Sequence, residues 1–500
     1  MLAQTDGRKI VNDALTAMGG VDRVMSVSSL VVEGGGHDFE IDQGFRWDEL
    51  GLQSDLSQIR DYKRTYDLVN GRARFEQTHQ REYAFYEGNG PVRQVQGLDG
   101  LIAFNVSPEG KVSRMFAPGQ LANVRFEYLR HPLTLLRAAL APNSTIANVR
   151  ASGGEQLIDL TLPGSPPINL TVAFDNANKL PTRVFRMADS PTMGDRPIET
   201  RFAEYASISG IQLPTRLISK IDRFVNADLR ITKQTINSDV TDLAVPASVV
   251  SATPPANGGQ GPGQQFPVTA QEVAKGIWMI AGTTHHSLLV EFSDHLMIID
   301  AVNIERTQAV MAKAKELRPN KPVTQLLMTH HHSDHTGGNR TAVALGVNEI
   351  IAYKTNVPYL NEMFRRPHTI NPDLFVRNNA KAPKITSIDD EGTIEDAAMT
   401  VKLYHLLDNS HADSQLLIYF PRQRVLTQAD DYMPNDGRNI TTSEPLGHAP
   451  WNANVLANIN YRKLQVDVMA PIHGEVVPYS QFVENAIMVT QYLPPATGSK

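Results

Sequence analysis

A dense run of imidazole and carboxylate groups stands in the second half of the chain. Residues 330–335 read His-His-His-Ser-Asp-His, and Thr336-Gly337-Gly338 follows directly. Such groups are the ligands that suit zinc and neighbouring first-row metals, and packing several together without a metal would cost heavily in desolvation. A histidine-rich surface loop is the alternative, but such loops rarely carry an aspartate in register before Thr-Gly-Gly. The run therefore predicts a metal site.

The spacing within the run divides its ligands between two ions. Residues two apart in an extended loop project to the same side, so His330 and His332 can bind one ion while His331 points away. Asp334 and His335 fall past a bend and can face a second ion. His331 is therefore predicted to be replaceable without loss of metal.

Two ions need more ligands than one loop supplies, and the chain offers three further candidates near the ends of predicted strands. A lone histidine at such a position is more often structural, so each candidate is weak evidence by itself. His411 can complete the site of His330 and His332, His473 can join Asp334 and His335, and Asp430 can bridge both ions.

The order and spacing of these seven residues resembles the metallo-β-lactamase superfamily, over roughly residues 268–492. The resemblance implies an α/β fold, a four-layer αβ/βα sandwich with a dinuclear site at one edge of its two sheets. It implies Asp430 rather than Asp431 as the bridging residue, because the family places this aspartate directly after a strand and a small residue. It also implies two zinc ions per chain, with iron and manganese left open by the ligand types.

The implied chemistry is hydrolysis. Two ions about 3.5 to 4 Å apart hold a bridging hydroxide that attacks a carbonyl, and the metals stabilise the oxyanion and the leaving group. Asp334 has proton relay and simple ligation as alternative roles. Lactonases of the superfamily tend to place a tyrosine shortly after the bridging aspartate. Tyr432 is therefore a candidate donor to the oxyanion or leaving group, with packing as the alternative.

Several branches of the superfamily fit this chain poorly. The absence of cysteine excludes the β-lactamases that use a cysteine ligand, and the three-histidine β-lactamases generally lack an aspartate like Asp430. The expected activity is hydrolysis of an ester or lactone, as in the acyl-homoserine lactonase branch. β-Lactam hydrolysis is one alternative. A non-catalytic periplasmic protein that binds a lipid or another ligand and keeps a vestigial metal site is an alternative of a different class.

The domain organisation follows from a segment rich in proline and glycine. Residues 246–267 lack periodicity and are predicted to be a linker between domains at 1–245 and 268–500. Three of the fifteen histidines precede the linker and twelve follow it, so the chemistry is assigned to the second domain.

Short alternating runs in the first domain predict a curved antiparallel sheet, with helices over residues 8–18 and 121–140. This domain resembles, diffusely, the half-barrel of bacterial lipoprotein carriers and sorting factors, which implies an apolar ligand or a role in shaping the substrate site. The second domain alternates strands with helices. Its strands are expected at 277–281, 287–292, 296–299, 324–328, 350–353, 384–388, 399–404, 415–420, 425–427 and 466–469, and its helices at 304–317, from 336 onward and at 481–492.

Composition narrows the partners. The net charge is −6 with no basic stripe, which argues against nucleic acid. No apolar run approaches the roughly 20 residues that cross a bilayer, and the first residues lack the pattern of a signal peptide. A small-molecule substrate, in which an apolar acyl portion is allowed, is the expected partner, and an oligomer is allowed. The likeness to periplasmic carriers favours a periplasmic or secreted location.

Overall fold

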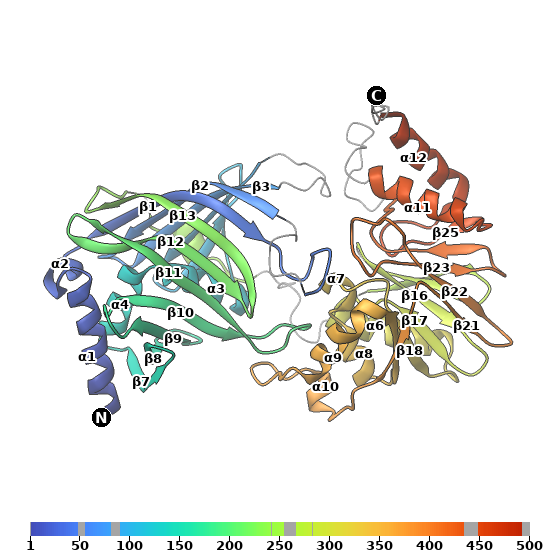
Figure 1. The fold of residues 1–500 in the computed structure, drawn as a ribbon, viewed down its shortest axis with the longest axis horizontal. Coiled ribbons are helices and arrows are strands. Elements are labelled where there is room, and N and C mark those ends of the chain that lie inside the picture. The colour runs from blue at the N-terminus through green and yellow to red at the C-terminus, as the bar shows by residue number, and fades with distance from the viewer. Residues whose placement is uncertain are drawn as a thin grey trace.

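The computed structural model describes residues 2–48, 56–81, 91–241, 243–254, 267–282, 284–434 and 449–492. The N-terminal and C-terminal halves are built around separate sheets and lie side by side (Figure 1). Most of the predicted linker lies outside the described residues, and the short helix α5 (Ala247–Val250) occupies its beginning. Among the described helices, none has the length and apolar character needed to span a membrane.

The N-terminal half contains one sheet of thirteen strands in which every neighbouring pair is antiparallel, as the alternating sequence runs predicted. Side chains of a strand alternate between its faces, and in β9 the residues Ile168, Leu170, Val172 and Phe174 are all buried. In sheet order the strands are β6 (Val112–Arg114), β5 (Ile102–Val106), β4 (Val92–Asp99), β3 (Arg72–Arg81), β2 (Leu56–Asp67), β1 (Ser29–Phe39), β13 (Phe224–Ile236), β12 (Ile211–Ile221), β11 (Arg196–Ile208), β10 (Pro181–Ala188), β9 (Ile168–Asp175), β8 (Glu155–Leu162) and β7 (Thr145–Ser152).

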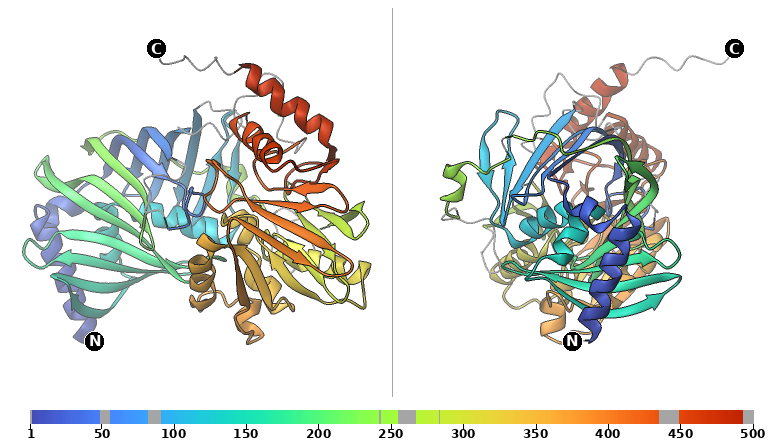
Figure 2. Two further views of the ribbon diagram at one scale, coloured as in Figure 1. Left: turned by 45° about the vertical axis from the view of Figure 1, so that its right-hand side comes forward. Right: turned by 90° about the vertical axis from the view of Figure 1, so that its left-hand side faces the viewer.

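The sheet curves around α3 (Pro118–Tyr128) and α4 (Pro132–Leu140) (Figure 2). Helices α1 (Leu2–Ala17) and α2 (Val21–Met25) lie at one end of the curved sheet (Figure 1). The prediction of one helix across residues 121–140 is wrong, because the helix is interrupted between α3 and α4. Proline lacks a backbone N–H and favours the first turn of a helix, so Pro132 starts a new helix whose N-cap, His131, accepts a hydrogen bond from Leu133 N–H.

The C-terminal half contains two sheets packed face to face. One is mixed, in the order β14 (Thr269–Ala274), β15 (Ile277–Ala281), β16 (His286–Glu291), β17 (Leu296–Ile299), β18 (Val323–Leu327), β19 (Glu349–Tyr353) and β20 (Lys384–Ile388). The other runs β21 (Glu391–Glu395), β22 (Thr400–His405), β23 (Leu416–Phe420), β24 (Val425–Thr427), β25 (Val468–Met469) and β26 (Val477–Pro478). Strand β14, strand β21 and helix α11 (Ala449–Tyr461) were not predicted.

Helices cover the outer face of each sheet, and three apolar clusters separate the resulting four layers. In β17, Met297 and Ile299 face the other sheet, whereas Leu296 and Ile298 face the helices. On that side lie α6 (Ile304–Leu317), α8 (Asn339–Ala344), α9 (Val357–Arg365) and α10 (Leu374–Arg377). On the far side, α11 and α12 (Tyr479–Tyr492) cover the second sheet. This is the αβ/βα sandwich that the sequence predicted.

The two halves touch through turns at one end of the curved sheet. The β10–β11 turn donates a hydrogen bond from Asp195 N–H to the Pro367 carbonyl at 2.8 Å. Near the β12–β13 turn, Arg223 pairs with Glu362 at 2.8 Å. The loop that follows β1 contacts the histidine run directly.

Candidate metal centre

Parallel strands β17 and β18 end at the same edge of their sheet and carry the histidine run there. Asp300 follows β17, and its carboxylate accepts hydrogen bonds from the N–H and the hydroxyl of Thr329 at 2.8 and 2.7 Å. A Cβ at Gly338 would collide with Thr307 Oγ1, so glycine is required where α8 approaches this edge. These contacts fix the backbone that presents the imidazoles.

Four buried residues form the first group of possible ligands, with ligand atoms within 4.8 Å of one another. They are His330, His332, His411 and Asp430. Asp430 Oδ2 lies 2.8 Å from His411 Nε2 and 3.1 Å from His330 Nε2, and these two ring nitrogens are 3.3 Å apart. The group converges on one point.

The second group adjoins the first and consists of His285, Asp334, His335 and His473. The other oxygen of Asp430, Oδ1, lies 2.6 Å from His473 Nε2 and 3.1 Å from His335 Nε2. Asp430 therefore presents one carboxylate oxygen to each group, which is the geometry of a bridging ligand.

The structure brings all seven predicted ligands into these two groups, divided as the spacing suggested. The neighbouring Asp431 takes a different role. Its carboxylate accepts hydrogen bonds from Asn409 and Gln415, and burial raises its pKa to about 6. The assignment of each of the seven as a metal ligand remains a prediction.

Sequence reasoning missed His285, which stands in the second group with its Nε2 3.0 Å from Asp334 Oδ2. Its ring lies against that of His473, with centroids 4.0 Å apart. The available signal was the pair His285-His286 at the start of β16, but no spacing rule tells which of the two faces the site. His286 instead accepts a hydrogen bond from Gly282 N–H through Nδ1.

His331 lies outside both groups, as the alternation in the loop predicted. Its ring is buried, with Nε2 donating to the Gly44 carbonyl and Nδ1 accepting from Ser414 Oγ, both at 3.0 Å. Both ring nitrogens are thus used in packing the loop.

The hydrogen bonding of His332 and the protonation state of His330 both suit a metal ion in the first group. His332 Nε2 donates to the Gly44 carbonyl at 3.0 Å, which leaves Nδ1 as the lone-pair nitrogen, and that atom is buried without a hydrogen-bond partner among the described residues. Burial, reinforced by the nearby His335, lowers the pKa of His330 to about 3 and keeps this ring neutral. Neutral imidazole is the form that binds metal.

His335 is oriented by Asp300, which accepts its Nδ1–H at 2.8 Å and turns Nε2 toward Asp430. A carboxylate behind a ligating histidine fixes the ring and raises its basicity, and it is a regular feature of metal sites. Asp300 is fully buried, so this pair is shielded from water.

A loop from the N-terminal half completes the surroundings of the cluster. Gln43 Nε2 donates to Asp334 Oδ1 at 2.9 Å, and Gly44 supplies the carbonyl that fixes His332. Backbone bonds from Ser333 N–H to the Asp42 carbonyl and from Asp413 N–H to the Phe45 carbonyl attach the loop on both sides. The N-terminal half therefore contributes directly to the order of the candidate metal centre.

A cavity of about 540 Å³ opens beside the second group and is lined by both halves. Its lining includes Asp334 and His285 of the second group, and Arg306 and Arg196. The size is within the range of roughly 300 to 1,000 Å³ in which proteins bind small molecules. A substrate in this cavity would meet the second group first.

Tyr432 packs in the apolar layer under α11 and α12. Its ring lies 4.8 Å from that of Phe482, and its hydroxyl accepts a hydrogen bond from Asn485 at 3.0 Å. These contacts give the phenol partners on the helical side of the sheet, and its role as a donor in catalysis remains a prediction.

The four-layer sandwich and the cluster of histidine and aspartate at its edge define the class of protein. Residues 281–473, which lie in the C-terminal half, match the model of the metallo-beta-lactamase superfamily. The resemblance drawn from the seven residues is confirmed at this level.

Two curated relatives are sulfatases by name. An alkyl/aryl-sulfatase of Saccharomyces cerevisiae is 29% identical over 177 residues, covering 29% of this chain and 27% of the relative. A linear primary-alkylsulfatase of Pseudomonas sp. is 23% identical over 235 residues, covering 41% of this chain and 44% of the relative. The chain thus spans less than half the length of each.

Two solved structures are also similar to part of this chain. The rubredoxin oxygen:oxidoreductase of Desulfovibrio gigas has a TM-score of 0.36 and 13% identity, covering 45% of this chain and 61% of its own. The metallo-beta-lactamase FIM-1 of Pseudomonas aeruginosa has a TM-score of 0.33 and 19% identity, covering 45% and 96%.

Proposed function

We propose that this protein is a metal-dependent hydrolase that cleaves an ester bond in a small molecule, with two divalent metal ions, zinc first among them, at the His/Asp cluster. The observation that carries the proposal is Asp430, whose two oxygens face two separate groups of ligand atoms at 2.6 to 3.1 Å. The superfamily match and the two sulfatase relatives support a hydrolase.

When bound, a pair of metal ions polarises the scissile bond and lowers the pKa of water enough to provide a nucleophile near neutral pH. The protein supplies the geometry. Asp430 holds the two ligand groups together, Asp300 orients His335, and the Gly44 carbonyl sets the tautomer of His332. The buried walls exclude other water, which strengthens every charge interaction at the site.

Asp334 is the carboxylate that faces the substrate. It lines the 540 Å³ cavity, and its side chain is 37% exposed, whereas that of Asp430 is 6% exposed. Hydrogen bonds from Gln43 and His285 fix its two oxygens. We assign to Asp334, besides ligation, the relay of a proton from the attacking water to the departing alcohol.

Two observations favour a sulfate ester as the substrate class. Both curated relatives are named as sulfatases. The cavity is lined by the guanidinium groups of Arg196 and Arg306, and guanidinium groups suit a planar or tetrahedral oxyanion. Arg196 also pairs with Asp42 at 3.7 Å, and Arg306 donates to the His285 carbonyl at 2.8 Å, so both side chains are held in place beside the cavity.

A carboxylic ester or lactone is the second candidate. In the sequence, an aspartate expected to bridge the two histidine groups favoured the lactonase branch. The contacts of Asp430 with His411 and His473 support this candidate. The same apparatus would attack a carbonyl, with the oxyanion stabilised at the cluster.

The test is a side-by-side hydrolysis panel on zinc-loaded protein, with an aryl sulfate, a linear alkyl sulfate, an aryl acetate, an acyl-homoserine lactone and a β-lactam. We expect cleavage of a sulfate ester above the others, and a loss of roughly 10³-fold in kcat/KM for Asp430→Ala. The control is His295→Ala, a histidine that hydrogen-bonds Gln325 away from the cluster. Metal-loaded protein that cleaves none of the five substrates, or full activity in Asp430→Ala, would contradict the proposal.

A further inference from the structure

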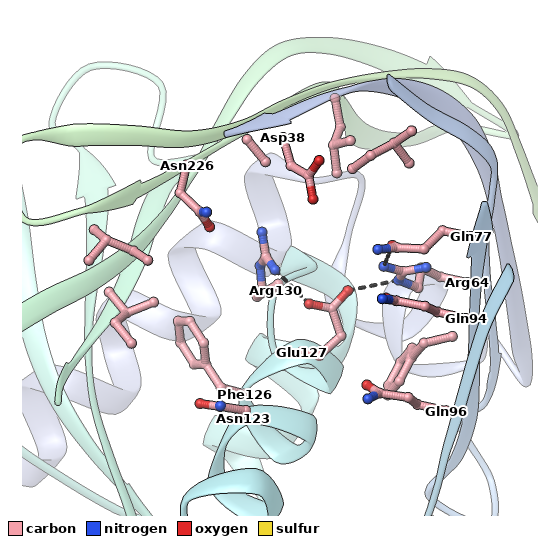
Figure 3. A pocket seen from close by; sticks show the side chains of 16 residues that line it. Asp38, Arg64, Gln77, Gln94, Gln96, Asn123, Phe126, Glu127, Arg130 and Asn226 are labelled. Carbon is pink, nitrogen blue, oxygen red and sulfur yellow. Dashed lines mark hydrogen bonds and ion pairs between the residues drawn. The ribbon is translucent and has the colours of Figure 1, made fainter. Parts of the chain in front are cut away.

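A second cavity, of about 320 Å³, lies inside the curved sheet of the N-terminal half (Figure 3). Helix α3 forms one wall, and strands from two parts of the same curved sheet form the others. Its volume is at the lower end of the range of roughly 300 to 1,000 Å³ for small-molecule sites, so it suits a ligand of a few heavy atoms up to one ring or two.

The charged side chains of this cavity neutralise one another. Glu127 stands between Arg64 and Arg130, with Oε1 2.7 Å from Arg64 Nε and Oε2 2.6 Å from Arg130 Nη1 (Figure 3). Burial opposes ionisation of Glu127, but the two guanidinium groups outweigh it and hold its pKa at about 2. Arg64 also donates to Gln77, and Arg130 to Thr200 and Ser219. Both arginines are therefore already hydrogen-bonded to other residues of the protein.

Groups with hydrogen-bonding capacity left for a ligand are neutral amides and one carboxylate oxygen. Asp38 Oδ1 is buried without a hydrogen-bond partner among the described residues. Asn226 donates to the Phe39 carbonyl through Nδ2 at 3.0 Å, which leaves its amide oxygen as an acceptor. Gln94 and Gln96 project into the cavity from the opposite wall (Figure 3).

The lining also has an apolar side. Phe126 on α3 and Phe75 on β3 border the same space as the amides. A ligand that fits must offer hydroxyl or N–H donors to Asp38 and Asn226, acceptors to the glutamine amides, and an apolar face to the phenylalanine rings. Two arginines and two acids line the cavity, so the lining carries no net charge to hold an ion.

We propose that this cavity is a binding site for a small, neutral, hydroxyl-rich molecule of the size of a monosaccharide. Such a molecule has alternating hydroxyl donors and acceptors and an apolar C–H face, which together match the two sides of the lining. An acyl chain would leave Asp38, Asn226 and the glutamines without hydrogen-bond partners on burial, which disfavours its binding. The site is independent of the metal centre and of the proposed hydrolase activity.

The test is saturation-transfer NMR on the full chain with D-glucose, N-acetyl-D-glucosamine and myo-inositol as probes, and with laurate and D-glucuronate as comparison probes. We expect transfer to at least one neutral probe. Gln96→Ala should weaken its binding by about tenfold, the worth of one or two hydrogen bonds. Ala227→Phe, which fills the cavity from β13, should abolish binding.

The matched control is Gln271→Ala, an exposed glutamine on β14 outside the cavity, which should bind as the unaltered protein does. Gln96 is only partly buried, so its variant keeps the test valid if Ala227→Phe fails to fold. Transfer to laurate or glucuronate in preference to all three neutral probes would overturn the proposal. So would the absence of transfer to any neutral probe, or equal binding in the unaltered protein and Gln96→Ala.

Discussion

Two buried polar clusters, one in each half, differ in how their polar groups are paired. In the N-terminal cavity two arginines enclose one glutamate, and each charge has an opposite partner within hydrogen-bond distance. In the C-terminal cluster, ring nitrogens face one another at 3.3 Å, in the pairs His411–His330 and His473–His335. His332 Nδ1 has no hydrogen-bond partner among the described residues. Histidine nitrogens and carboxylate oxygens gathered in this way are the ligand types that bind a divalent metal, whereas the N-terminal cluster is balanced by its own charges.

The two clusters should therefore be stabilised by different interactions. Lowering the pH should remove the stabilisation that the ion pairs of Glu127 give to the N-terminal half. The pKa of Glu127 is depressed in the folded state, so its contribution is fully present above its unfolded value of about 4.5 and is lost as pH falls toward about 2. The loss amounts to at most about 3 kcal/mol. Unfolding free energies of the unaltered protein and Glu127→Gln should differ most near pH 6 and converge as pH falls below about 4. A difference that stays constant with pH would show that this ion pair does not stabilise the fold.

In the C-terminal cluster, removing the charge behind a ligand should weaken metal binding without emptying the site. Asp300→Asn keeps the shape of the residue that holds His335 and Thr329 but removes its charge. We expect metal affinity to fall by about 10- to 100-fold, measured by competition with a chromophoric chelator. Unchanged affinity would mean that His335 needs no such support. Asp467→Asn, on an exposed ion pair with Arg424, is the matched control.

Substitution of His331 distinguishes a packing role from metal ligation within the same loop. Its side chain is buried with both ring nitrogens bonded, so His331→Ala should cost about 1 to 3 kcal/mol of unfolding free energy, with the metal content of the folded protein retained. Denaturant titration and metal analysis of the same sample measure both quantities. Loss of metal equal to that in His332→Ala would place His331 among the ligands and invalidate the register of the loop.

The smallest effect is expected for the contact that the N-terminal half makes with the cluster. Gln43→Ala removes one hydrogen bond to Asp334, and we expect metal affinity to fall by about two- to tenfold. Gln58→Ala, on β2 and hydrogen-bonded to Arg60, should leave the metal affinity unchanged. Equal affinities in both variants would show that the loop covers the site without ordering it.

The family resemblance carried by the seven residues implied the sandwich, and strand ends and local spacing predicted that these residues gather at one site. Asp430 and Asp431 could be told apart only through the family resemblance, and the structure explains the choice by their different hydrogen bonds. The contacts of the loop after β1 could not be predicted. Gly44 acts through its backbone carbonyl on a residue 288 positions away, and a carbonyl leaves no signature in the sequence.

The most direct test of the account is the metal content of the full chain after zinc loading and removal of free metal, measured by native mass spectrometry for the unaltered protein and for Asp430→Ala. Because Asp430 offers one oxygen to each of two ligand groups, the account predicts about two ions per chain in the unaltered protein and fewer than about one in the variant. An unaltered protein that retains no metal, or a variant that retains as much as the unaltered protein, would contradict it.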